Sequence, residues 1–572
     1  MSRIINSLRN EFIESQGITS ISDATDFEKF CNFFIIQNEY SKTLNPETVT
    51  VGAGNDTGID GIAIFVNGHL VEDISEVDDL LEKNGQLDVS FIMVQSKTSA
   101  SFDTGDMLKF YNGVNDFFSE AHQLPSNDDI KHYLEISDYI FSKASEFREN
   151  PKLKLYYVTT GVFDPLNEHL LAIRDNATKT LENMRMFRSV NNNLLGEIDI
   201  TRLYRKSKTP EEASFEFERK AILPKIEGVK EAYFGVLPFS EFVKILKDEN
   251  GQIRNVFDDN VRDFQGVNNP VNKAITKTLE ECEPSIFSIL NNGITVVATD
   301  AKVTSTTFTI LDYQIVNGCQ TSNVLFEYQV NNSIDDLNVP FRLIVTSDED
   351  LKSKITISTN NQTLVKTDQL AAMSEFQKNL ELYYSSITGE DRLYYERRSK
   401  QYNSDKSVIK KRVITVANLL KTFSSMFRQD PHKVTTYYGS LARNIGHDGS
   451  GLFEKSHQFA PYYLAGLVFY YLEEMFRKGV VDTKYRKVKF YVTMLIPLLA
   501  TDKAFPVLNS KKKCEAYTKE IAAKLKNFEE CKKIYSKAIS IIEDSHAPID
   551  DKQALKSQKM TQQIMTHYKQ IK

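Results

Sequence analysis

The sequence predicts an α+β multidomain protein with three parts: a mixed α/β domain, a central α+β domain and a mostly α-helical C-terminal region. The chain has 572 residues, more than one hydrophobic core usually organises. Helix-type and strand-type patterns alternate over the first 220 residues, and apolar residues recur almost wholly at helical spacing from residue 410 onward. These observations favour separate cores for the two ends of the chain.

The first domain is predicted over residues 1–220. A helix is expected at 25–40, and the Asn67-Gly68 pair is a strong two-residue hairpin signal between the strand IDGIAIFV and the returning segment HLVEDI. The later elements are expected as the strand DVSFIMVQSK, a helix near 104–121, a strand at 152–161, a helix at 163–184, a short strand at 196–204 and a charged helical connector at 209–220.

An α+β domain is predicted over residues 225–410 and a helical part over 411–572. Strands are expected around 294–298, 306–311 and 341–346, with helices from about 367 onward. Segment 460–478 is strongly apolar, but its two glutamates favour a buried core helix over a membrane span. The final helices, 510–543 and 551–570, are Lys-rich and could form a homodimer interface.

Several protein classes are disfavoured. No stretch approaches the ~18 consecutive apolar residues of a membrane span, and the start lacks the apolar segment of a secretory signal. The five cysteines are scattered, with no CxxC pair, so a reducing cytoplasm fits best. The sequence contains neither the G-x-x-x-x-G-K-[ST] phosphate loop nor an HExxH zinc motif.

Charge is distributed unevenly along the chain. The net charge is −7, which argues against a protein that coats nucleic acid by bulk charge. Residues 1–100 contain 6 Lys/Arg against 16 Asp/Glu, a balance of −10, whereas residues 391–412 contain 8 against 3, a balance of +5. The basic segment is therefore a candidate local track for nucleic acid.

Polar side chains gather at the end of the strand that begins FIMV. Gln95 and Lys97 are two residues apart and share one face of that strand. The preceding residues are apolar on both faces, which predicts a central, covered strand. Asp60 lies at the mouth of the hairpin strand between glycines that allow close approach. If the two strands pair, Asp60, Gln95 and Lys97 converge, with Glu28 of the first predicted helix as a fourth member.

This group suits hydrolysis of a phosphodiester. Carboxylate and amide oxygens are ligands for Mg²⁺ or Mn²⁺, so Asp60, Gln95 and Glu28 are the predicted metal-binding residues. Lys97 would orient the attacking water or neutralise developing charge. Two alternatives remain open. Asp60 could belong to ordinary turn chemistry, and Asp56, in the turn before the strand, could take its place.

The order of these motifs resembles the Mrr-like branch of the PD-(D/E)XK nuclease superfamily. The matching stretches are Phe27-Glu28, Gly58-Ile59-Asp60-Gly61 and Val94-Gln95-Ser96-Lys97. The resemblance implies a restriction-endonuclease-like domain in which Asp60 and Gln95 lie next to the metal, Lys97 is catalytic and Glu28 is supportive. Gln95 stands where the wider superfamily has an acid, which leaves the metal stoichiometry open. Many such enzymes act as dimers.

A second resemblance covers roughly residues 225–500. It is carried by FDDNVRDFQG (257–266), SIFSILNNGIT (285–295), YQIVNGCQTS (313–322), ISTNNQTLVKTDQLAA (357–372) and LYYERRSKQY (393–402). Together they look like the AIPR family, named for abortive infection and phage resistance. The resemblance implies an anti-phage effector that responds to a phage-derived trigger.

Amide, basic and tyrosine side chains in this second half are candidates for nucleic-acid contacts. The predicted binding residues are Arg397, Arg398, Tyr395, Lys400, Lys410, Lys411, Arg412, Asn292, Asn317 and Gln320. The same Asn-Asn-Gly and Asn-Gly sequences are also common β-turns, and that alternative remains open.

The combined prediction is a cytoplasmic defence nuclease that cuts nucleic acid, DNA favoured over RNA, with Mg²⁺ or Mn²⁺. The AIPR-like half would recognise the target or the infection signal, or restrain the nuclease. Two rivals remain: a nuclease fold that only senses nucleic acid, and an interaction protein that binds a phage protein.

Overall fold

The computed structural model describes residues 2–40, 43–51, 54–208, 211–247, 251, 254, 256–257, 270–281, 284–330, 332–334, 337–360, 374–398, 401–402, 405, 407–434, 441, 445–447 and 449–572. The chain divides into two compact units. Unit 1 contains residues 1–204 together with 371–572, and unit 2 contains residues 205–370. Unit 1 is therefore built from two segments far apart in the sequence.

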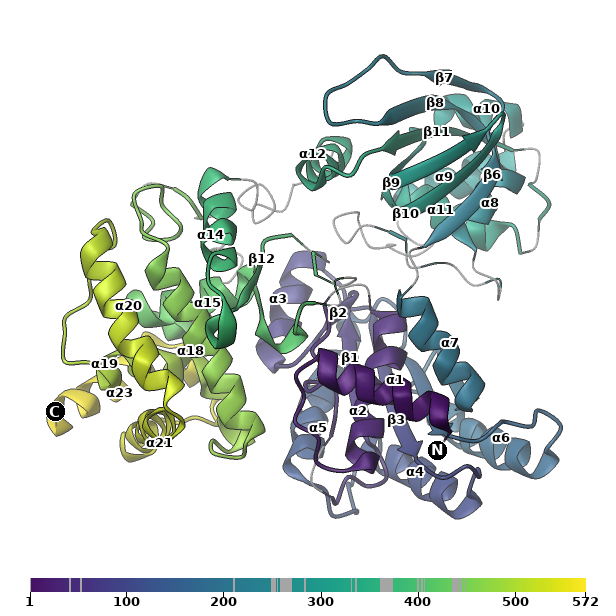
Figure 1. Ribbon diagram of the computed structural model, residues 1–572. Coiled ribbons are helices and arrows are strands. Elements are labelled where there is room, and N and C mark those ends of the chain that lie inside the picture. Colours follow the sequence, from purple (N-terminus) through teal and green to yellow (C-terminus); the bar gives the residue numbers. More distant parts are fainter. Residues whose placement is uncertain are drawn as a thin grey trace. The chain divides into compact units, whose positions relative to one another are not determined.

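The N-terminal segment of unit 1 is built around a five-stranded mixed sheet in the order β2-β1-β3-β4-β5 (Figure 1). β1 is antiparallel to both of its neighbours, and β3, β4 and β5 run parallel to one another. The elements are α1 (Arg3–Ser15), α2 (Asp23–Glu39), β1 (Gly61–Val66), β2 (His69–Leu70), α3 (Ile74–Asn84), β3 (Val89–Lys97), α4 (Thr104–Phe117), α5 (Asp128–Ser142), β4 (Lys152–Thr159), α6 (Glu168–Asn183), β5 (Ser189–Leu195) and α7 (Glu197–Lys208).

Helices cover both faces of this sheet. Ile92 and Val94 of β3 share a core with apolar residues of α1, α2 and α7, and Phe91 and Met93 share another with residues of α4 and α5. Alternate residues of β3 thus enter opposite cores, which is why the strand is apolar on both faces. Functional groups of such a strand can emerge only near its ends.

The C-terminal segment of unit 1 is a helical assembly. Its core joins residues of α15, α18, α19, α20 and α21, with Tyr462 stacked on Phe423 at a ring separation of 3.9 Å. The elements are α14 (Glu375–Ser385), β12 (Tyr394–Glu396), β13 (Val413–Thr415), α15 (Val416–Phe427), α16 (Pro431–Val434), α18 (Ala460–Arg477), α19 (Lys489–Ala500), α20 (Lys511–Lys526), α21 (Phe528–Asp544), α22 (Lys552–Leu555) and α23 (Gln558–Ile571).

Unit 2 contains a six-stranded sheet in the order β6-β10-β9-β11-β8-β7. All neighbours are antiparallel except β9 and β11. The elements are β6 (Glu212–Glu216), β7 (Lys220–Ile222), β8 (Glu231–Pro238), α8 (Phe239–Leu246), α9 (Pro270–Glu281), α10 (Pro284–Leu290), β9 (Ile294–Thr304), β10 (Thr307–Asn317), α11 (Cys319–Tyr328), β11 (Asn338–Val345) and α12 (Glu349–Asn360). Residues of α8, α10 and α11 enter the main core on one face.

The predicted fold class, α+β with a helical C-terminal region, is confirmed, but two local predictions are wrong. Residues 196–204 form most of helix α7, not a strand, and the strand that precedes them is β5. Ile200 and Tyr204 of α7 are buried four residues apart, which is helical spacing. The predicted helical connector at 209–220 contains strand β6, which pairs with β10.

The boundaries of the two compact units differ from the boundaries of the predicted domains. The first boundary was expected near residue 220, whereas unit 1 changes to unit 2 between Tyr204 and Arg205. The physical reason is the pairing of β6 and β7 with strands of the second sheet. The helical region also begins earlier than 411, because α14 and β12 pack in unit 1.

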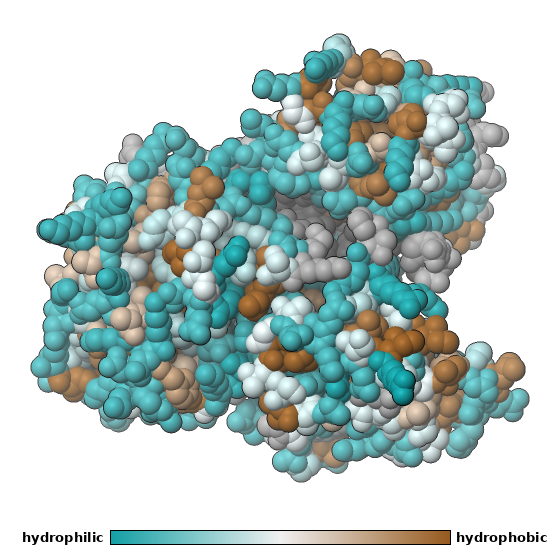
Figure 2. Space-filling view, in the orientation of Figure 1, coloured by the Kyte–Doolittle hydropathy of each residue, from teal (hydrophilic) through white to brown (hydrophobic). Residues whose placement is uncertain are grey.

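The exposed surface carries scattered apolar residues. Figure 2 shows a mostly hydrophilic face with hydrophobic groups dispersed over it. Leu166, Ile289 and Ile21 are among the most exposed large apolar side chains, and single exposures of this kind are usual. Among the described residues, no helix is both long enough and apolar enough to cross a membrane.

Candidate functional site

Asp60 and the end of β3 are joined directly by hydrogen bonds. Gln95 Nε2 donates to Asp60 Oδ2 at 2.5 Å, and the backbone N–H of Ser96 donates to the same oxygen at 2.7 Å. The Ser96 hydroxyl lies 3.3 Å from it. Asp60 is 5% exposed and Gln95 2% exposed. The hairpin therefore packs beside β3, which is the condition under which the sequence predicts that these side chains converge, and places the carboxylate against the amide.

The backbone of Asp60 is fixed as firmly as its side chain. Its N–H donates to Val94 O at 2.8 Å, and its carbonyl accepts from Val51 N at 2.9 Å. β1 then begins at Gly61, paired with Val94. Asp60 is thus held at the point where the chain enters the sheet, and its carboxylate has a defined position before any ligand binds.

The surroundings of Asp60 disfavour its negative charge. The pKa of this carboxyl is raised to about 7. Burial is the main cause, and the charges of Glu28 and Asp56 add to it, while the N–H of Ser96 and the charge of Lys97 lower the pKa. Burial, followed by the charge of Asp56, also raises the pKa of Glu28. Three carboxylates therefore share one electrostatic environment with Lys97.

Asp60, Glu28 and Gln95 are the side chains that could hold a divalent cation here. Nearby carboxylates with raised pKa values repel one another, and a bound cation would relieve that repulsion. Mg²⁺ is commonly held by one or two carboxylates with water in its remaining positions. Asp60 and Glu28 could supply the carboxylates and Gln95 an amide oxygen. Within the described ranges, no group of three or more His, Cys, Asp or Glu residues has the arrangement of a preformed metal site, so water would have to complete the shell.

A chain of ion pairs joins the N-terminal segment of unit 1 to its helical segment. Lys29 Nζ lies 3.5 Å from Glu47 Oε1, and Arg477 Nε lies 3.1 Å from Glu47 Oε2. Arg477 also binds Glu474, which faces Lys411 at 3.8 Å. Lys29 is the neighbour of Glu28 on α2, so the chain reaches the edge of the candidate site.

Three of the predicted nucleic-acid residues are internal. Tyr395 has no exposed surface, and its hydroxyl donates to Gln377. Arg397 is 5% exposed and binds Glu381 through Nε at 2.8 Å. Lys410 is 6% exposed and donates to the carbonyl oxygen of Asp405 at 2.9 Å. These side chains hold the segment together and are not part of an exposed track.

The other predicted basic residues of this segment are also engaged. Lys411 faces Glu474, and burial lowers its pKa. Arg412 donates to the carbonyl of Arg392 at 3.0 Å and stacks over the Tyr470 ring. Arg398 lies 3.6 Å from Glu381. Lys400, and most of the motif stretches 257–266 and 357–372, fall outside the described residues.

The two Asn-Gly motifs of unit 2 meet each other. Gly293 and Gly318 have φ values of +82° and +93°, and a Cβ on Gly318 would lie 3.0 Å from Gly293 O. Asn291 Nδ2 donates to Thr321 Oγ1 at 3.2 Å. A turn-forming role therefore accounts for the glycines and for Asn291.

The predicted binding residues next to these glycines are placed differently. Asn317 Nδ2 donates to Thr359 O near the end of α12. Asn292 is exposed beside the turn, and Gln320 is half-buried in the first turn of α11. The motifs thus bring the start of α11 and the end of α12 together.

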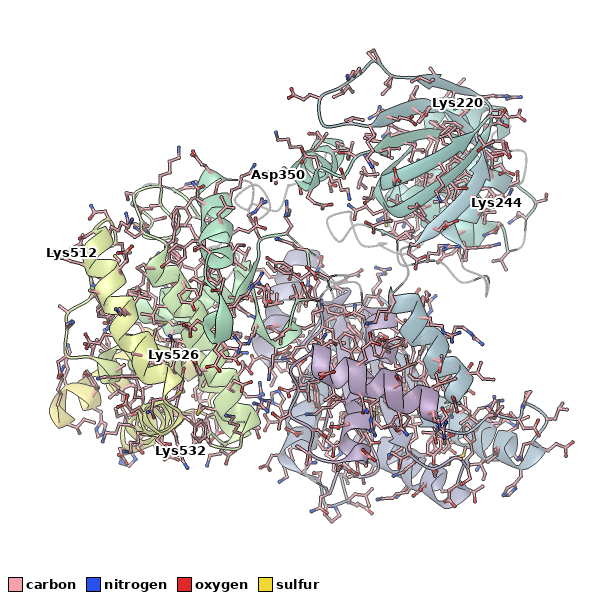
Figure 3. The ribbon with its side chains drawn as sticks, viewed as in Figure 1. Lys220, Lys244, Asp350, Lys512, Lys526 and Lys532 are labelled. Carbon is pink, nitrogen blue, oxygen red and sulfur yellow. The ribbon has the colours of Figure 1, made fainter. Side chains whose placement is uncertain are left out.

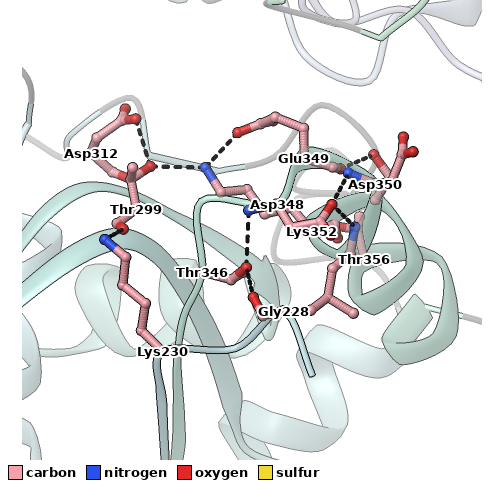
Figure 4. Close-up of polar contacts among 12 residues, drawn as sticks. Gly228, Lys230, Thr299, Asp312, Thr346, Asp348, Glu349, Asp350, Lys352 and Thr356 are labelled. Atoms are coloured by element: carbon pink, nitrogen blue, oxygen red, sulfur yellow. Dashed lines mark hydrogen bonds and ion pairs between the residues drawn. The ribbon is translucent and has the colours of Figure 1, made fainter. Parts of the chain in front are cut away.

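A polar cluster secures the start of α12 (Figure 4). Lys352 is 7% exposed, and its Nζ donates to Thr299 Oγ1 at 2.8 Å and to Glu349 at 2.7 Å. Thr299 in turn donates to Asp312 at 2.8 Å. With Asn317 at its other end, α12 is attached to the sheet at both ends.

Sequence reasoning missed two kinds of group. The first is Asn32, whose Nδ2 donates to Asp60 O at 2.9 Å, and the backbone N–H of Ser96. The second is the exposure of the lysines on α20 and α21, among them Lys512 and Lys532 (Figure 3), which were expected from the sequence only as part of a dimer interface. Asn32 had a signal, because it follows Glu28 by four residues and so shares its helix face.

Comparison with known proteins finds one match. The family described as AIPR protein matches residues 257–548, which is 292 of the 572 residues and begins beyond the candidate site. No curated protein and no solved structure matches the chain. The match spans the later part of unit 2 and most of the helical segment of unit 1.

Proposed function

The chain belongs to the AIPR family, and from that premise we propose that it is an anti-phage, abortive-infection type defence protein whose N-terminal sheet hydrolyses phosphodiester bonds of nucleic acid, most simply DNA. The observation that carries the proposal is the environment of the Asp60 carboxylate. A buried carboxylate held by Gln95 and Ser96, with a pKa raised to about 7 beside Glu28, suits a site that takes a cation.

Each residue has a stated role. Asp60, Glu28 and Gln95 would hold Mg²⁺ or Mn²⁺, which when bound supplies a Lewis acid next to the scissile phosphate. Lys97 ends the same strand and would orient the water or neutralise the charge that develops on the phosphoryl oxygens. Gln95 has a second task, because its amide fixes the carboxylate of Asp60.

The family part would control this site rather than form it. The ion-pair chain from Lys411 through Glu474, Arg477 and Glu47 to Lys29 gives the helical segment a physical connection to α2. A phage-derived trigger that shifts α18 would change the charges next to Glu28. The exposed lysines of α20 and α21 would contact the phosphate backbone through charge, independent of base sequence.

The test is cleavage of a mixed panel of plasmid, linear duplex, single-stranded DNA and total RNA. Mg²⁺ and Mn²⁺ are compared with EDTA, in buffer and in infected-cell extract. The variants are Asp60→Asn and Lys97→Ala. Matched controls are Asp128→Asn and Lys131→Ala, an exposed ion pair of the same sheet domain.

The proposal expects metal-dependent cutting that falls by at least about 10²-fold in both site variants and stays unchanged in both controls. Equal cutting by all four variants would overturn the site assignment. Binding of nucleic acid with no cutting under any condition would instead favour the rival sensor role.

A further inference from the structure

We propose that Asn32 is a positioning residue of this site: its side-chain amide fixes the backbone of Asp60, and so sets the affinity of the site for a divalent cation. The inference rests on the proposed function. It assigns a role to a residue that none of the motifs FE, GxDG or QxK contains.

Asn32 lies in the middle of α2, one turn after Glu28. Residues 30–36 of this helix are all buried, and Asn32 is the one polar side chain in that run. It has no exposed surface. A buried amide in an apolar helix face costs free energy unless it is hydrogen-bonded, so its contacts indicate what it is for.

The amide nitrogen of Asn32 is directed at the turn that carries Asp60. Nδ2 donates to Asp60 O at 2.9 Å and lies 3.4 Å from Thr50 Oγ1. Asp60 is thus held by two side-chain amides, Gln95 at the carboxylate and Asn32 at the carbonyl. Loss of either would let the carboxylate move relative to Glu28.

Gly61 also lies against the side-chain amide of Asn32. A Cβ built on Gly61 would lie 2.4, 2.5 and 2.7 Å from Oδ1, Cγ and Nδ2 of Asn32. The backbone of Gly61 does not have a positive φ, so it is the proximity of Asn32, not backbone conformation, that excludes a side chain here. This explains why a glycine follows Asp60.

The amide oxygen of Asn32 differs from the amide nitrogen in its contacts. Oδ1 is buried and accepts no hydrogen bond within the described part of the chain. An unpaired buried acceptor is unfavourable. Water held by a bound cation donates to protein oxygens, and this oxygen belongs to the side chain whose Nδ2 binds Asp60 O, so it could accept from such a water.

The first test measures Mn²⁺ binding by calorimetry, without substrate. Asn32→Ala is compared with Asn38→Ala, an exposed asparagine on the same helix, and with Asp60→Asn. We expect about a tenfold weaker affinity for Asn32→Ala, because supporting residues of metal sites commonly contribute 10–100-fold. Asn38→Ala should bind as wild type does, and Asp60→Asn should lose binding.

The outcomes separate the two proposals. If Asp60→Asn binds Mn²⁺ as wild type does, the cation site itself is wrong. If Asp60→Asn loses binding while Asn32→Ala and Asn38→Ala both retain wild-type affinity, only the role of Asn32 is wrong.

The second test covers the case in which Asn32→Ala folds poorly. Thermal midpoints are compared for wild type, Gly61→Ala, Asn32→Ala and the double variant. The structure predicts that Gly61→Ala lowers the midpoint in the wild-type background and has a much smaller effect once the Asn32 amide is removed. An equal effect in both backgrounds would contradict the placement of Asn32 against Gly61.

Discussion

Arg477 and Glu47 form an ion pair, with 3.1 Å between Nε and Oε2, that joins helix α18 to the segment before β1. The side chains are 25% and 11% exposed. Glu47 also faces Lys29, the neighbour of Glu28. Glu47 thus links family-matched helix α18 to α2, which carries a predicted site residue, although the match itself begins at residue 257.

Arg477→Met should destabilise unit 1. The substitution removes the ion pair of Arg477 with Glu47, and loss of a charged hydrogen-bond partner in a mostly buried place costs about 1–3 kcal/mol. Chemical denaturation measures it. Lys131→Ala breaks an exposed pair and is the control, with an expected change below about 0.5 kcal/mol. Equal changes in the free energy of unfolding for the two variants would show that the Arg477 pair stabilises unit 1 no more than the exposed pair does.

Asp60 should make stability depend on pH in a defined direction. Its folded-state pKa, about 7, lies above the ordinary 3.8, so the folded chain binds this proton more tightly than the unfolded chain does. The contribution to stability is complete below pH 3.8 and is lost as the pH rises through about 7. The Asp60→Asn variant should not lose stability in this way, because the asparagine side chain does not titrate.

The measurement is the thermal midpoint of wild type and Asp60→Asn in EDTA at pH 5.5 and 8.5. The midpoint of Asp60→Asn relative to wild type should rise between the two values. A difference that is the same at both would mean that the carboxyl does not titrate in this range.

Arg397→Met should lower stability and leave nucleic-acid affinity intact. Arg397 is buried against Glu381, and removal of one partner of a buried pair typically costs about 3–5 kcal/mol. Binding of a labelled duplex at fixed salt, below the unfolding transition, checks the second half. A loss of affinity above about tenfold in folded protein would restore Arg397 to the binding surface.

Gly318→Ala should be more harmful than Gly251→Ala. Both glycines belong to unit 2 and have positive φ values, +93° and +74°. A Cβ at residue 318 would lie 2.7 Å from Ile294 Cγ1, whereas nothing lies within 4 Å of one at residue 251. The control therefore carries only the left-handed backbone cost, roughly 1–2 kcal/mol. Thermal midpoints of the two variants measure the steric part, and equal midpoints would contradict the contact.

The sequence predicts that Asp60 and Gln95 meet on the condition that the hairpin packs beside the strand of Gln95, and the structure meets that condition. A two-residue period gave the face of Gln95. The Asn67-Gly68 signal accounts for the pairing of β1 with β2, whereas the pairing of β1 with β3 has no sequence signal of its own. The N–H of Ser96 could not be foreseen, since a backbone donor has no residue signature. Asn32 was missed because the apolar pattern around it concealed a single polar residue.

The burial of Tyr395, Arg397 and Lys410 in the basic segment was missed for a different reason. Composition records that residues 391–412 are rich in Lys and Arg, but not that Glu381 and Glu474, from α14 and α18, face them. Such partners come from tertiary structure, and a charge run alone cannot tell an exposed track from an internal network. Strand β6 was misjudged for a similar reason, because it owes its conformation to pairing with β10.

The split construction of unit 1 has a consequence for synthesis. Arg477 leaves the ribosome 430 residues after Glu47 (477 minus 47). At roughly 5–20 residues per second, that is a delay of about 20–90 s. During this interval the nascent sheet carries Asp60 and Lys97 without the helices that later pack beside it. Any restraint that those helices exert on the site therefore begins only after residue 477 has been synthesised.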